Sequence, residues 1–535
     1  MIMFDAIVIG SGHNGLAAAA GLAAKGWKVG VFEAADSPGG AVRSAELTIP
    51  GFKHDLAAMN LSLFAGSAFH AENAETLASH GLAFVPARDC FATAWPDGRW
   101  LGVSTDVNIT AARIGGFSQK DATAWRAMLT EFGETAGPIL AVLGSRMTPL
   151  SLARTLFSIW RKHGSKRLFS LARLLLQSPR AFLDENFESP HLKAMMAAWG
   201  MHLDFAPDQA GGAMFPYLES MANQAFGLVI GRGGAQTMTG ALCAMLTENG
   251  GELHCGARVA KINTANGTAT GISLEDGRQF TASRAVIANV HPKALLANGF
   301  KPDKNHSSLL DQPTDTPSFD RAVSKFISAP GTMMLHLALS DLPNWRAAEL
   351  RRFAYVHLAP SLDMMSLAYQ QAKAGLLPSE PVLVIGQPTT IDPSRAPAGQ
   401  HTLWVQVRMV PAVIKGDGLT SGKIIAARDW ANAKEPMAER ILDIIERYAP
   451  DLRARILGST IVSPLDLQAG NANLVGGDQI SGSHHLAQNF LSRPAAGFAD
   501  GSTPIKKLHL VGASVWPGAG VGAGSGYQLL KQLAK

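Results

Sequence analysis

Cysteine is scarce in this chain of 535 residues, which has only Cys90, Cys243 and Cys255. No two of them stand at Cys-x-x-Cys spacing, so the sequence offers neither a disulfide framework nor a paired dithiol. This absence argues against dithiol chemistry of the thioredoxin reductase type. Residues 256–535 contain no cysteine at all, which excludes a thioether link to a cofactor from that region.

Several other signals are missing. No run of about eighteen apolar residues occurs, so no membrane-spanning helix is expected. The first predicted strand begins within about five residues of Met1, which leaves no room for a secretory signal and predicts a cytoplasmic protein. There is no Gly-x-Ser-x-Gly elbow and no His-Glu-x-x-His pair, so neither hydrolase chemistry nor a metal site is predicted.

Acidic residues are absent between Gly137 and Leu183, where the chain carries only cations. These are Arg146, Arg154, Arg161, Lys162, Lys166, Arg167, Arg173 and Arg180. Helical periodicity groups Leu152, Leu156, Ile159 and Trp160 on one face, and Leu168, Leu171 and Leu175 on another. The pattern predicts two cationic amphipathic helices, which either contact an anionic membrane surface over residues 146–180 or present a solvated basic face. Without a recognised reader motif, nucleic-acid binding is not favoured.

Glycine, in contrast, recurs at a regular spacing near the start of the chain. The apolar run Ala6 to Ile9 predicts a buried strand, and it is followed by Gly10, Ser11, Gly12, His13, Asn14 and Gly15. This Gly-x-Gly-x-x-Gly spacing is typical of the turn between a strand and a helix that binds a pyrophosphate. The helix N-terminus supplies amides and a positive dipole end, so no lysine or arginine is needed there.

Glu33 ends the next predicted strand, at the position from which a carboxylate accepts the ribose hydroxyls of a dinucleotide. A 2′-phosphate would be repelled by this acid, so NADP is not expected. No second complete fingerprint follows elsewhere, and NAD(P)H is therefore not the obvious redox partner.

Glycine-rich segments return at Arg232 to Gly234 and at Gly512 to Gly522. The chain between them lacks such turns, which predicts an α/β fold with a discontinuous Rossmann-like nucleotide-binding domain and an inserted mixed α+β substrate domain. We assign residues 1–66, 215–291 and 464–535 to the first domain. Residues 67–214, expected to be mainly helical, and residues 292–463 are assigned to the second.

This order resembles the phytoene desaturase and flavin amine oxidase superfamily, and especially its phytoene-dehydrogenase-related branch. Besides the opening fingerprint, the resemblance rests on Gly39-Gly40, Gly51-Phe52, Gly233-Gly234, Val259, Asp392 to Ser394, Gly476-Gly477, Arg493-Pro494, Gly512 to Ser514 and Pro517 to Gly520. Ala41 departs from the arginine that many carotenoid desaturases carry there, which puts the role of Arg43 in question.

The resemblance implies FAD, bound non-covalently. Gly10, Gly12, Gly15 and Glu33, with Ser11, His13, Asn14 and Ala34 beside them, would hold its ADP half, and Val259 would touch the adenine. Gly39, Gly40 and Arg43 would lie along the pyrophosphate and flavin. Gly512 and Ala513 would contact the pyrophosphate and ribityl chain, and Gly520, Val521 and Gly522 the isoalloxazine. Covalent attachment through His484 or His485 is not favoured.

A flavin dehydrogenase needs orientation of its substrate and at most one general base. The weak candidates for a base are His484, His485, Tyr527 and Asp204. An apolar substrate lining is predicted from Met195, Met196, Trp199, Met201, Phe205, Met214 and Phe215, which are otherwise ordinary core residues.

The leading hypothesis is an FAD-dependent dehydrogenase or desaturase. It would transfer hydride to flavin N5 from a C–C bond of a hydrophobic, isoprenoid-like or alicyclic small molecule, with reoxidation by oxygen or a quinone. One alternative is C–N oxidation by a flavin amine oxidase, mildly disfavoured because the chain has only five tyrosines. The other is a flavin-free prenyl- or lipid-binding escort protein, against which the intact C-terminal segment argues.

Overall fold

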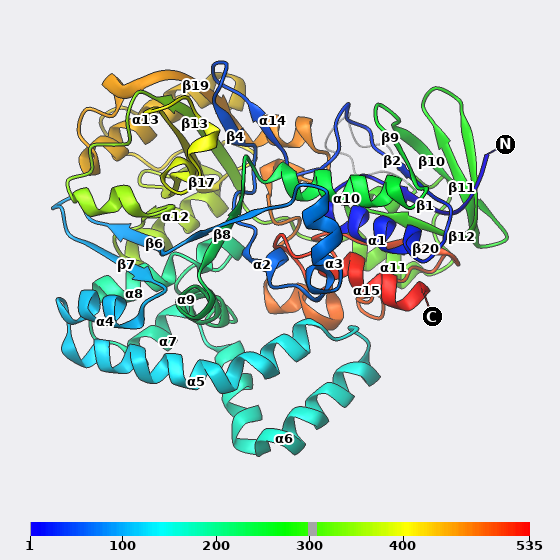
Figure 1. Cartoon of the computed structure of the whole chain (residues 1–535), viewed down its shortest axis with the longest axis horizontal. Coiled ribbons are helices and arrows are strands. Elements are labelled where there is room, and N and C mark those ends of the chain that lie inside the picture. Colours follow the sequence, from blue (N-terminus) through cyan, green and yellow to red (C-terminus); the bar gives the residue numbers. More distant parts are fainter. Residues whose placement is uncertain (1, 298–307, 535) are drawn as a thin grey trace.

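The structure is a computed structural model that describes residues 2–297 and 308–534. Within these residues the chain forms two lobes, each built on a seven-stranded sheet (Figure 1). Both termini lie in the lobe of the first sheet.

The first sheet has the strand order β10-β11-β12-β1-β2-β9, with β20 also paired to β12. Its strands are β1 (Ile2–Ile9), β2 (Val29–Phe32), β9 (Glu252–His254), β10 (Val259–Ala265), β11 (Thr268–Leu274), β12 (Gln279–Ala288) and β20 (Leu508–Leu510). The pairs β1–β12, β1–β2, β2–β9 and β12–β20 are parallel, whereas β10 and β11 join as antiparallel strands. The carboxyl ends of the parallel strands therefore share one edge, which is where doubly wound sheets bind nucleotides.

Three helices pack together on this sheet: α1 (His13–Ala23), α10 (Gln236–Glu248) and α15 (Gly524–Leu533). Alanines 17–20 of α1 are fully buried, and small side chains let the helices approach closely. At Gly21 an added Cβ would lie 2.2 Å from a methyl group of Leu530, so α15 is seated directly on α1. The last helix thus completes a layer that the first helix began.

The second sheet has the order β19-β13-β17-β16-β14-β6-β7. Its strands are β6 (Asp89–Ala94), β7 (Trp100–Ser104), β13 (Gly331–Leu339), β14 (Tyr355–Leu358), β16 (Val382–Gly386), β17 (His401–Val410) and β19 (Ile456–Val462). Helix α13 (Trp430–Tyr448) packs on one face, and the other face joins the core that includes α8 (Pro190–Ala197) and α9 (Met214–Phe226). The middle strands are buried on both faces, which explains their nearly continuous apolar sequence.

The expectation that residues 67–214 are mainly helical misses three strands. Besides β6 and β7 this stretch contains β5 (Phe84–Ala87), which pairs with β8 (Leu228–Gly231). Alternation is weak in these short strands, so periodicity did not separate them from loops. The chain supplies strands to the first sheet, the second, the first, the second and the first again, but the exact domain boundaries stay predictions.

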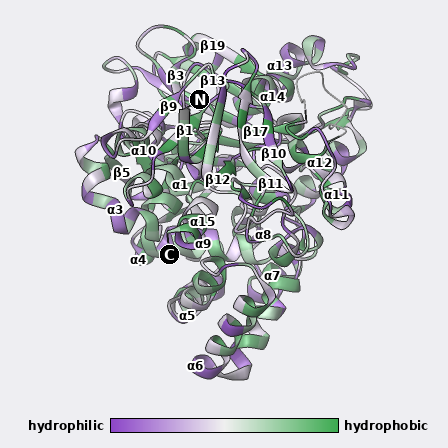
Figure 2. Cartoon of the chain, turned by 90° about the vertical axis from the view of Figure 1, so that its right-hand side faces the viewer, coloured by the Kyte–Doolittle hydropathy of each residue, from purple (hydrophilic) through white to green (hydrophobic). Residues whose placement is uncertain are grey.

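Six of the eight cations of the basic stretch lie in α6 (Pro149–Leu176), which follows α5 (Gln119–Leu143) and projects away from the body of the molecule (Figure 2). Thr148 caps α6 and Pro149 occupies its first turn, where the missing amide costs nothing. At Gly164 (φ 78°) the helix breaks into two halves, as the two apolar stripes predict. Helical periodicity groups Trp160 with the apolar face of Leu152, Leu156 and Ile159, but Trp160 is 47% exposed. No helix in residues 2–297 and 308–534 is long and apolar enough to cross a membrane.

Candidate cofactor and substrate site

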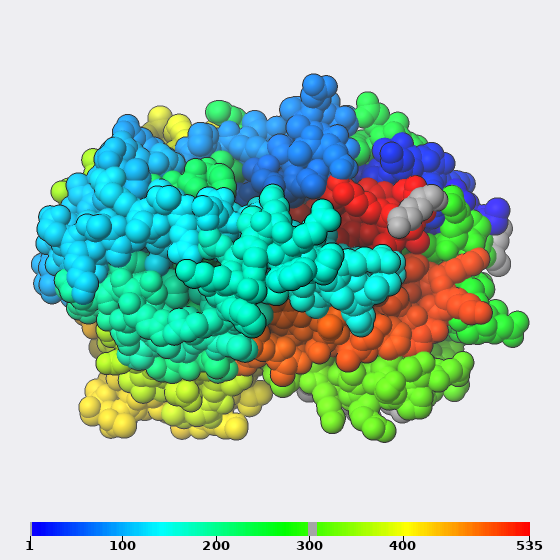
Figure 3. Space-filling model, turned by 90° about the horizontal axis from the view of Figure 1, so that it is seen from below, coloured from blue at the N-terminus to red at the C-terminus, as the bar shows by residue number. Residues whose placement is uncertain are grey.

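A cavity of about 2590 Å³ runs from the carboxyl edge of the first sheet to the helices α5, α6 and α9. At one end it is lined by the glycine turn after β1, and at the other by apolar side chains of those helices. In the view from below, the cyan segment of α5 and α6 lies across the surface of the molecule beside the red C-terminal segment (Figure 3). One continuous cavity therefore joins the predicted cofactor and substrate regions.

Most of the predicted cofactor residues line this cavity. They are Gly10, Gly12, His13, Asn14, Glu33, Ala34, Gly40, Arg43, Val259, Gly512, Ala513, Gly520, Val521 and Gly522. The other three, Ser11, Gly15 and Gly39, lie behind that lining and shape it. Their roles toward a bound cofactor stay predictions.

Asn289 supports the glycine turn by hydrogen bonds to its backbone, and sequence reasoning missed this residue. It follows β12, and its Nδ2 donates to the carbonyl oxygens of Gly10 (3.4 Å) and Gly12 (3.3 Å). An added Cβ on Gly12 or Gly15 would lie 2.7 or 2.9 Å from that nitrogen. Glycine is therefore required here by close packing, and the start of α1 stays open toward the cavity, an arrangement that suits an anion.

Glu33 lies just beyond the end of β2 and lines the same cavity. Its carboxylate accepts hydrogen bonds from the amide (2.8 Å) and hydroxyl (2.6 Å) of Ser11, and from the amide of Ala35 (2.9 Å). These bonds orient the carboxylate beside the glycine turn. A carboxylate in this position suits the ribose of an ADP group.

The pair Gly39-Gly40 lies against the first turn. The amide of Gly39 donates to the carbonyl of Ser11 (3.1 Å), and an added Cβ on Gly40 would lie 3.1 Å from Cα of Gly12. Arg43 donates from Nε to the carbonyl of Gly40 (3.0 Å) and from Nη2 to that of Gly470 (3.3 Å). Arg43 therefore links the first segment of the chain to the last third.

The C-terminal glycine segment closes the cavity over this cradle. Gly512 donates its amide to the hydroxyl of Ser525 (2.9 Å), which in turn donates to Oδ1 of Asn14 (2.9 Å). His13 bonds to the carbonyl of Gly520, although burial lowers the pKa of His13 to about 4. The two ends of the chain thus meet at the predicted position of the flavin. The packing fits an elongated dinucleotide that lies from Glu33 to Gly520.

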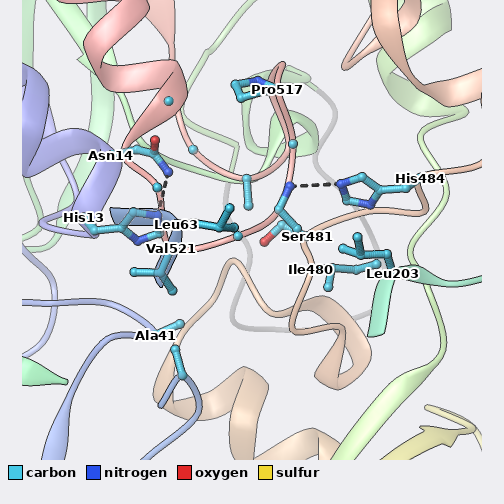
Figure 4. A pocket seen from close by; sticks show the side chains of 18 of the residues that line it. His13, Asn14, Ala41, Leu63, Leu203, Ile480, Ser481, His484, Pro517 and Val521 are labelled. Atoms are coloured by element: carbon cyan, nitrogen blue, oxygen red, sulfur yellow. Dashed lines mark hydrogen bonds between the residues drawn. The ribbon is translucent and has the colours of Figure 1, made fainter. Parts of the chain in front are cut away.

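His484 lines the cavity but is used to hold the C-terminal turn. Its Nε2 accepts the amide of Ala519 at 2.9 Å (Figure 4). Burial, with the nearby charge of Arg493, holds the pKa of His484 well below its usual value, so it stays a neutral acceptor. Arg493 is fully buried and donates to five carbonyl groups, four of them in residues 480–483 and one in Ala513.

The other candidate bases are less accessible. Nε2 of His485 lies 2.8 Å from the carbonyl oxygen and 3.4 Å from the carboxylate of Asp204, and neither residue is among the described lining of the cavity. Burial raises the pKa of Asp204, although the charge of His485 opposes this. Tyr527 lines the cavity, but its hydroxyl donates to Glu72. None of the four candidates is therefore identified as the general base.

The predicted apolar lining is correct for three of its seven residues. Trp199, Met214 and Phe215 line the cavity. Met195, Met196, Met201 and Phe205 are fully buried outside it, where they pack in the protein interior. A sequence cannot separate these cases, because core and apolar cavity walls use the same side chains.

The substrate end also holds groups that sequence reasoning missed. Tyr355 and Trp404 of the second sheet line it, with ring centroids 6.0 Å apart. Glu219 of α9 lines it as well, and burial raises the pKa of Glu219 to about 7.

Residues 15–330 match the model of the family described as flavin containing amine oxidoreductase. The chain belongs to this family. A relative from Rattus norvegicus, "Pyridine nucleotide-disulfide oxidoreductase domain-containing protein 2", is 27% identical over 98% of this chain and 92% of its own length. The phytoene desaturase (neurosporene-forming) of Cereibacter sphaeroides is 24% identical, over 96% of this chain and 91% of its own.

Among solved structures, an oxidoreductase from Methanosarcina mazei is similar over 99% of this chain and 100% of its own, with a TM-score of 0.61 and 18% identity. That likeness supports the fold. The resemblance to the phytoene desaturase and flavin amine oxidase superfamily, and the α/β fold with a Rossmann-like sheet, are thereby confirmed. This flavin oxidoreductase is therefore an enzyme that uses a flavin cofactor.

Proposed function

We propose that this flavin oxidoreductase binds FAD non-covalently and dehydrogenates a C–C bond of a hydrophobic substrate of isoprenoid-like or alicyclic type. The observation that carries the proposal is the continuous cavity, in which the glycine cradle opens directly into an apolar end. FAD, when bound, would supply the hydride acceptor at N5. Oxygen or a membrane quinone would reoxidise it.

The chain's own residues would bind the cofactor, orient the substrate and exclude water. The open start of α1 and Glu33 would hold the ADP half, and the turn at Gly520 to Gly522 would lie against the flavin ring. The apolar walls of α5, α6 and α9 would keep water from the reacting carbon. No residue is assigned as the base.

Oxidation of a C–N bond is the second candidate, and Tyr355 with Trp404 favours it. Two aromatic rings in a cavity attract a cationic amine through their faces. The hydroxyl of Tyr355 bonds to the backbone of Asn60, which would keep the ring in place. The third candidate, a flavin-free prenyl- or lipid-binding escort protein, is disfavoured by the intact segment from Gly512 to Gly522.

One experiment separates these candidates. The purified protein is mixed anaerobically with polyenes, cyclic ketones and amines, and bleaching of the flavin absorbance is followed. Bleaching by polyenes or alicyclic compounds supports the leading proposal, and bleaching by amines alone supports C–N oxidation. A protein that stays colourless after FAD is added would overturn both. Release of the flavin by acid precipitation tests non-covalent binding, and rapid reduction by NADPH would contradict reoxidation by oxygen or quinone alone.

We further propose that α6 docks this enzyme on an anionic membrane surface on the cytoplasmic side. Its inner face, including Leu152, Leu156 and Leu171, lines the cavity, whereas Phe157 and Trp160 are exposed outside it. Four cations of the basic stretch pair with acids, namely Arg146, Arg167, Arg173 and Arg180. The other four are exposed and have no acidic partner among the described residues: Arg154, Arg161, Lys162 and Lys166.

Sedimentation with vesicles that contain phosphatidylserine tests this docking. Each exposed cation near an anionic surface contributes about 1 kcal/mol, so changing the four unpaired cations to glutamine removes on the order of 4 kcal/mol and most of the binding. The matched control has the same change in net charge at exposed lysines elsewhere: Lys25, Lys53, Lys325 and Lys415. Equal binding by both quadruple variants would refute docking through α6.

A further inference from the structure

Helix α9 turns one continuous stripe toward the cavity. The stripe repeats with helical spacing and consists of Met214, Phe215, Leu218, Glu219, Ala222, Asn223 and Phe226. Tyr217, Ser220 and Met221 on the opposite side are buried in the protein. Glu219 is the ionisable residue of the stripe, and it lies midway along the helix among apolar neighbours.

The carboxylate of Glu219 has no hydrogen bond or ion pair among the described residues. Two buried arginines in the lobe of the second sheet, Arg408 and Arg395, have partners for their charges. Arg408 donates to the carbonyl groups of Met201 and His202 and to the hydroxyl of Thr332. Arg395 pairs with Asp55 and Asp392. Glu219 therefore differs from these two arginines, whose charges are paired or hydrogen-bonded within the protein.

An unpartnered carboxylate beside apolar surface is unfavourable, so it needs a reason that folding alone does not supply. Ligand cavities place a few polar groups in an apolar wall, because such groups fix the orientation of the ligand. Glu219 faces into the cavity where a substrate would lie. A hydrogen-bond donor on that substrate would supply the missing partner.

We propose that Glu219 is the polar anchor of the substrate end, and that it accepts a hydrogen bond from a hydroxyl or ammonium group on an otherwise lipophilic substrate. This inference rests on the proposed function and narrows its substrate class from plain hydrocarbons to lipophilic alcohols or amines. Glu219 is a specificity-determining residue in this account. The bond would hold one end of the substrate, so that the same carbon is presented to the flavin in each turnover.

Binding of three matched probes to the flavin-loaded enzyme tests the anchor without requiring turnover. The probes are octane, 1-octanol and octylamine, and binding is read from the fluorescence of tryptophan, because Trp199 and Trp404 line the cavity. We expect 1-octanol or octylamine to bind about tenfold more tightly than octane, as a hydrogen bond to a charged group predicts. Tight binding of octylamine alone identifies an ammonium partner, and tight binding of 1-octanol shows that a hydroxyl suffices.

The variants Glu219→Leu and Glu219→Gln decide whether this residue is responsible. Glu219→Leu should bind 1-octanol and octylamine no more tightly than octane, because their polar group would then be buried without a partner. Glu219→Gln, which has nearly the same shape, should keep part of the preference for 1-octanol. The control Leu218→Met changes the neighbouring wall position and should keep the full preference. A preference that survives in Glu219→Leu, or that is absent from the wild type, overturns the anchor. If the preference is as expected but no compound bleaches the flavin, the proposed dehydrogenation fails and the anchor stands.

Discussion

Replacing Gly15 with alanine isolates the packing that the glycine turn requires. Gly15 lies in the first turn of α1, where an added Cβ would stand 2.7 Å from the carbonyl oxygen of Gly10 and 2.9 Å from Nδ2 of Asn289. Both distances are below any normal contact, and the first partner is backbone. The turn must therefore shift, and overpacking of this kind costs about 1–3 kcal/mol.

Gly240 provides the matched control. It lies inside α10, is exposed, and would have nothing within 4 Å of an added Cβ. Alanine there should stabilise the protein by up to about 1 kcal/mol, because alanine favours the helix over glycine. Gly15→Ala carries a similar helical gain, so the difference between the two variants measures the overpacking alone.

The same shift should weaken flavin binding, since the turn would no longer present its amides to the pyrophosphate. FAD at about 100 times its dissociation constant adds about 2.7 kcal/mol to the free energy of unfolding. A tenfold loss of affinity would remove about 1.4 kcal/mol of that gain. Chemical denaturation with and without added FAD, on both variants, measures the two effects separately. If Gly15→Ala matches Gly240→Ala in both, the packing argument is wrong.

Three further outcomes are expected. Glu219→Gln should flatten the dependence of stability on pH: burial raises the pKa of Glu219 from 4.5 to about 7. The free energy of unfolding of the wild type should therefore fall relative to that of the variant as pH rises through that window, by at most about 1.4 kcal/mol per pH unit. The measurement is denaturant titration of both proteins across this pH range. The same dependence of the unfolding free energy on pH in both would contradict the prediction. Arg493→Lys keeps the charge but not the fork that reaches five carbonyl groups, so the unfolding free energy should fall by about 2 kcal/mol or more, as denaturant titration would detect. His484→Leu removes the acceptor for the amide of Ala519, so the free energy of unfolding should fall by about 1–3 kcal/mol and flavin should be lost. His484→Gln should restore part of the stability and part of the flavin content. Equal flavin content in the two variants would show that this hydrogen bond does not hold the turn.

The glycine turn and Glu33 could be found from the sequence because their signal is local. A strand, a glycine spacing, a helix and an acid in register leave few other folds for that segment. Asn289 could not be found in this way. It acts on the turn only because β12 pairs in parallel with β1, which brings Ala288 beside Ile9, and a single asparagine after a strand does not reveal that register.

The substrate end was less predictable for two physical reasons. The break at Gly164 shifts the phase between the halves of α6, and Trp160 follows the buried Ile159 by about 100° around the helix, so it faces outward. Glu219 reads as an ordinary surface acid on an amphipathic helix. Only the side chains that surround it in space show that it faces a cavity instead.

The contact between Ser525 and Asn14 spans 511 residues, and it has a consequence for synthesis. At about 5–20 residues per second, a ribosome needs roughly 25 to 100 seconds to extend the chain from one partner to the other. Throughout that time the glycine turn has emerged but lacks the segment that closes over it. A bound flavin could therefore be enclosed only after the segment from Gly512 to α15 has been made, and a chain that stops before α15 would leave the glycine turn open.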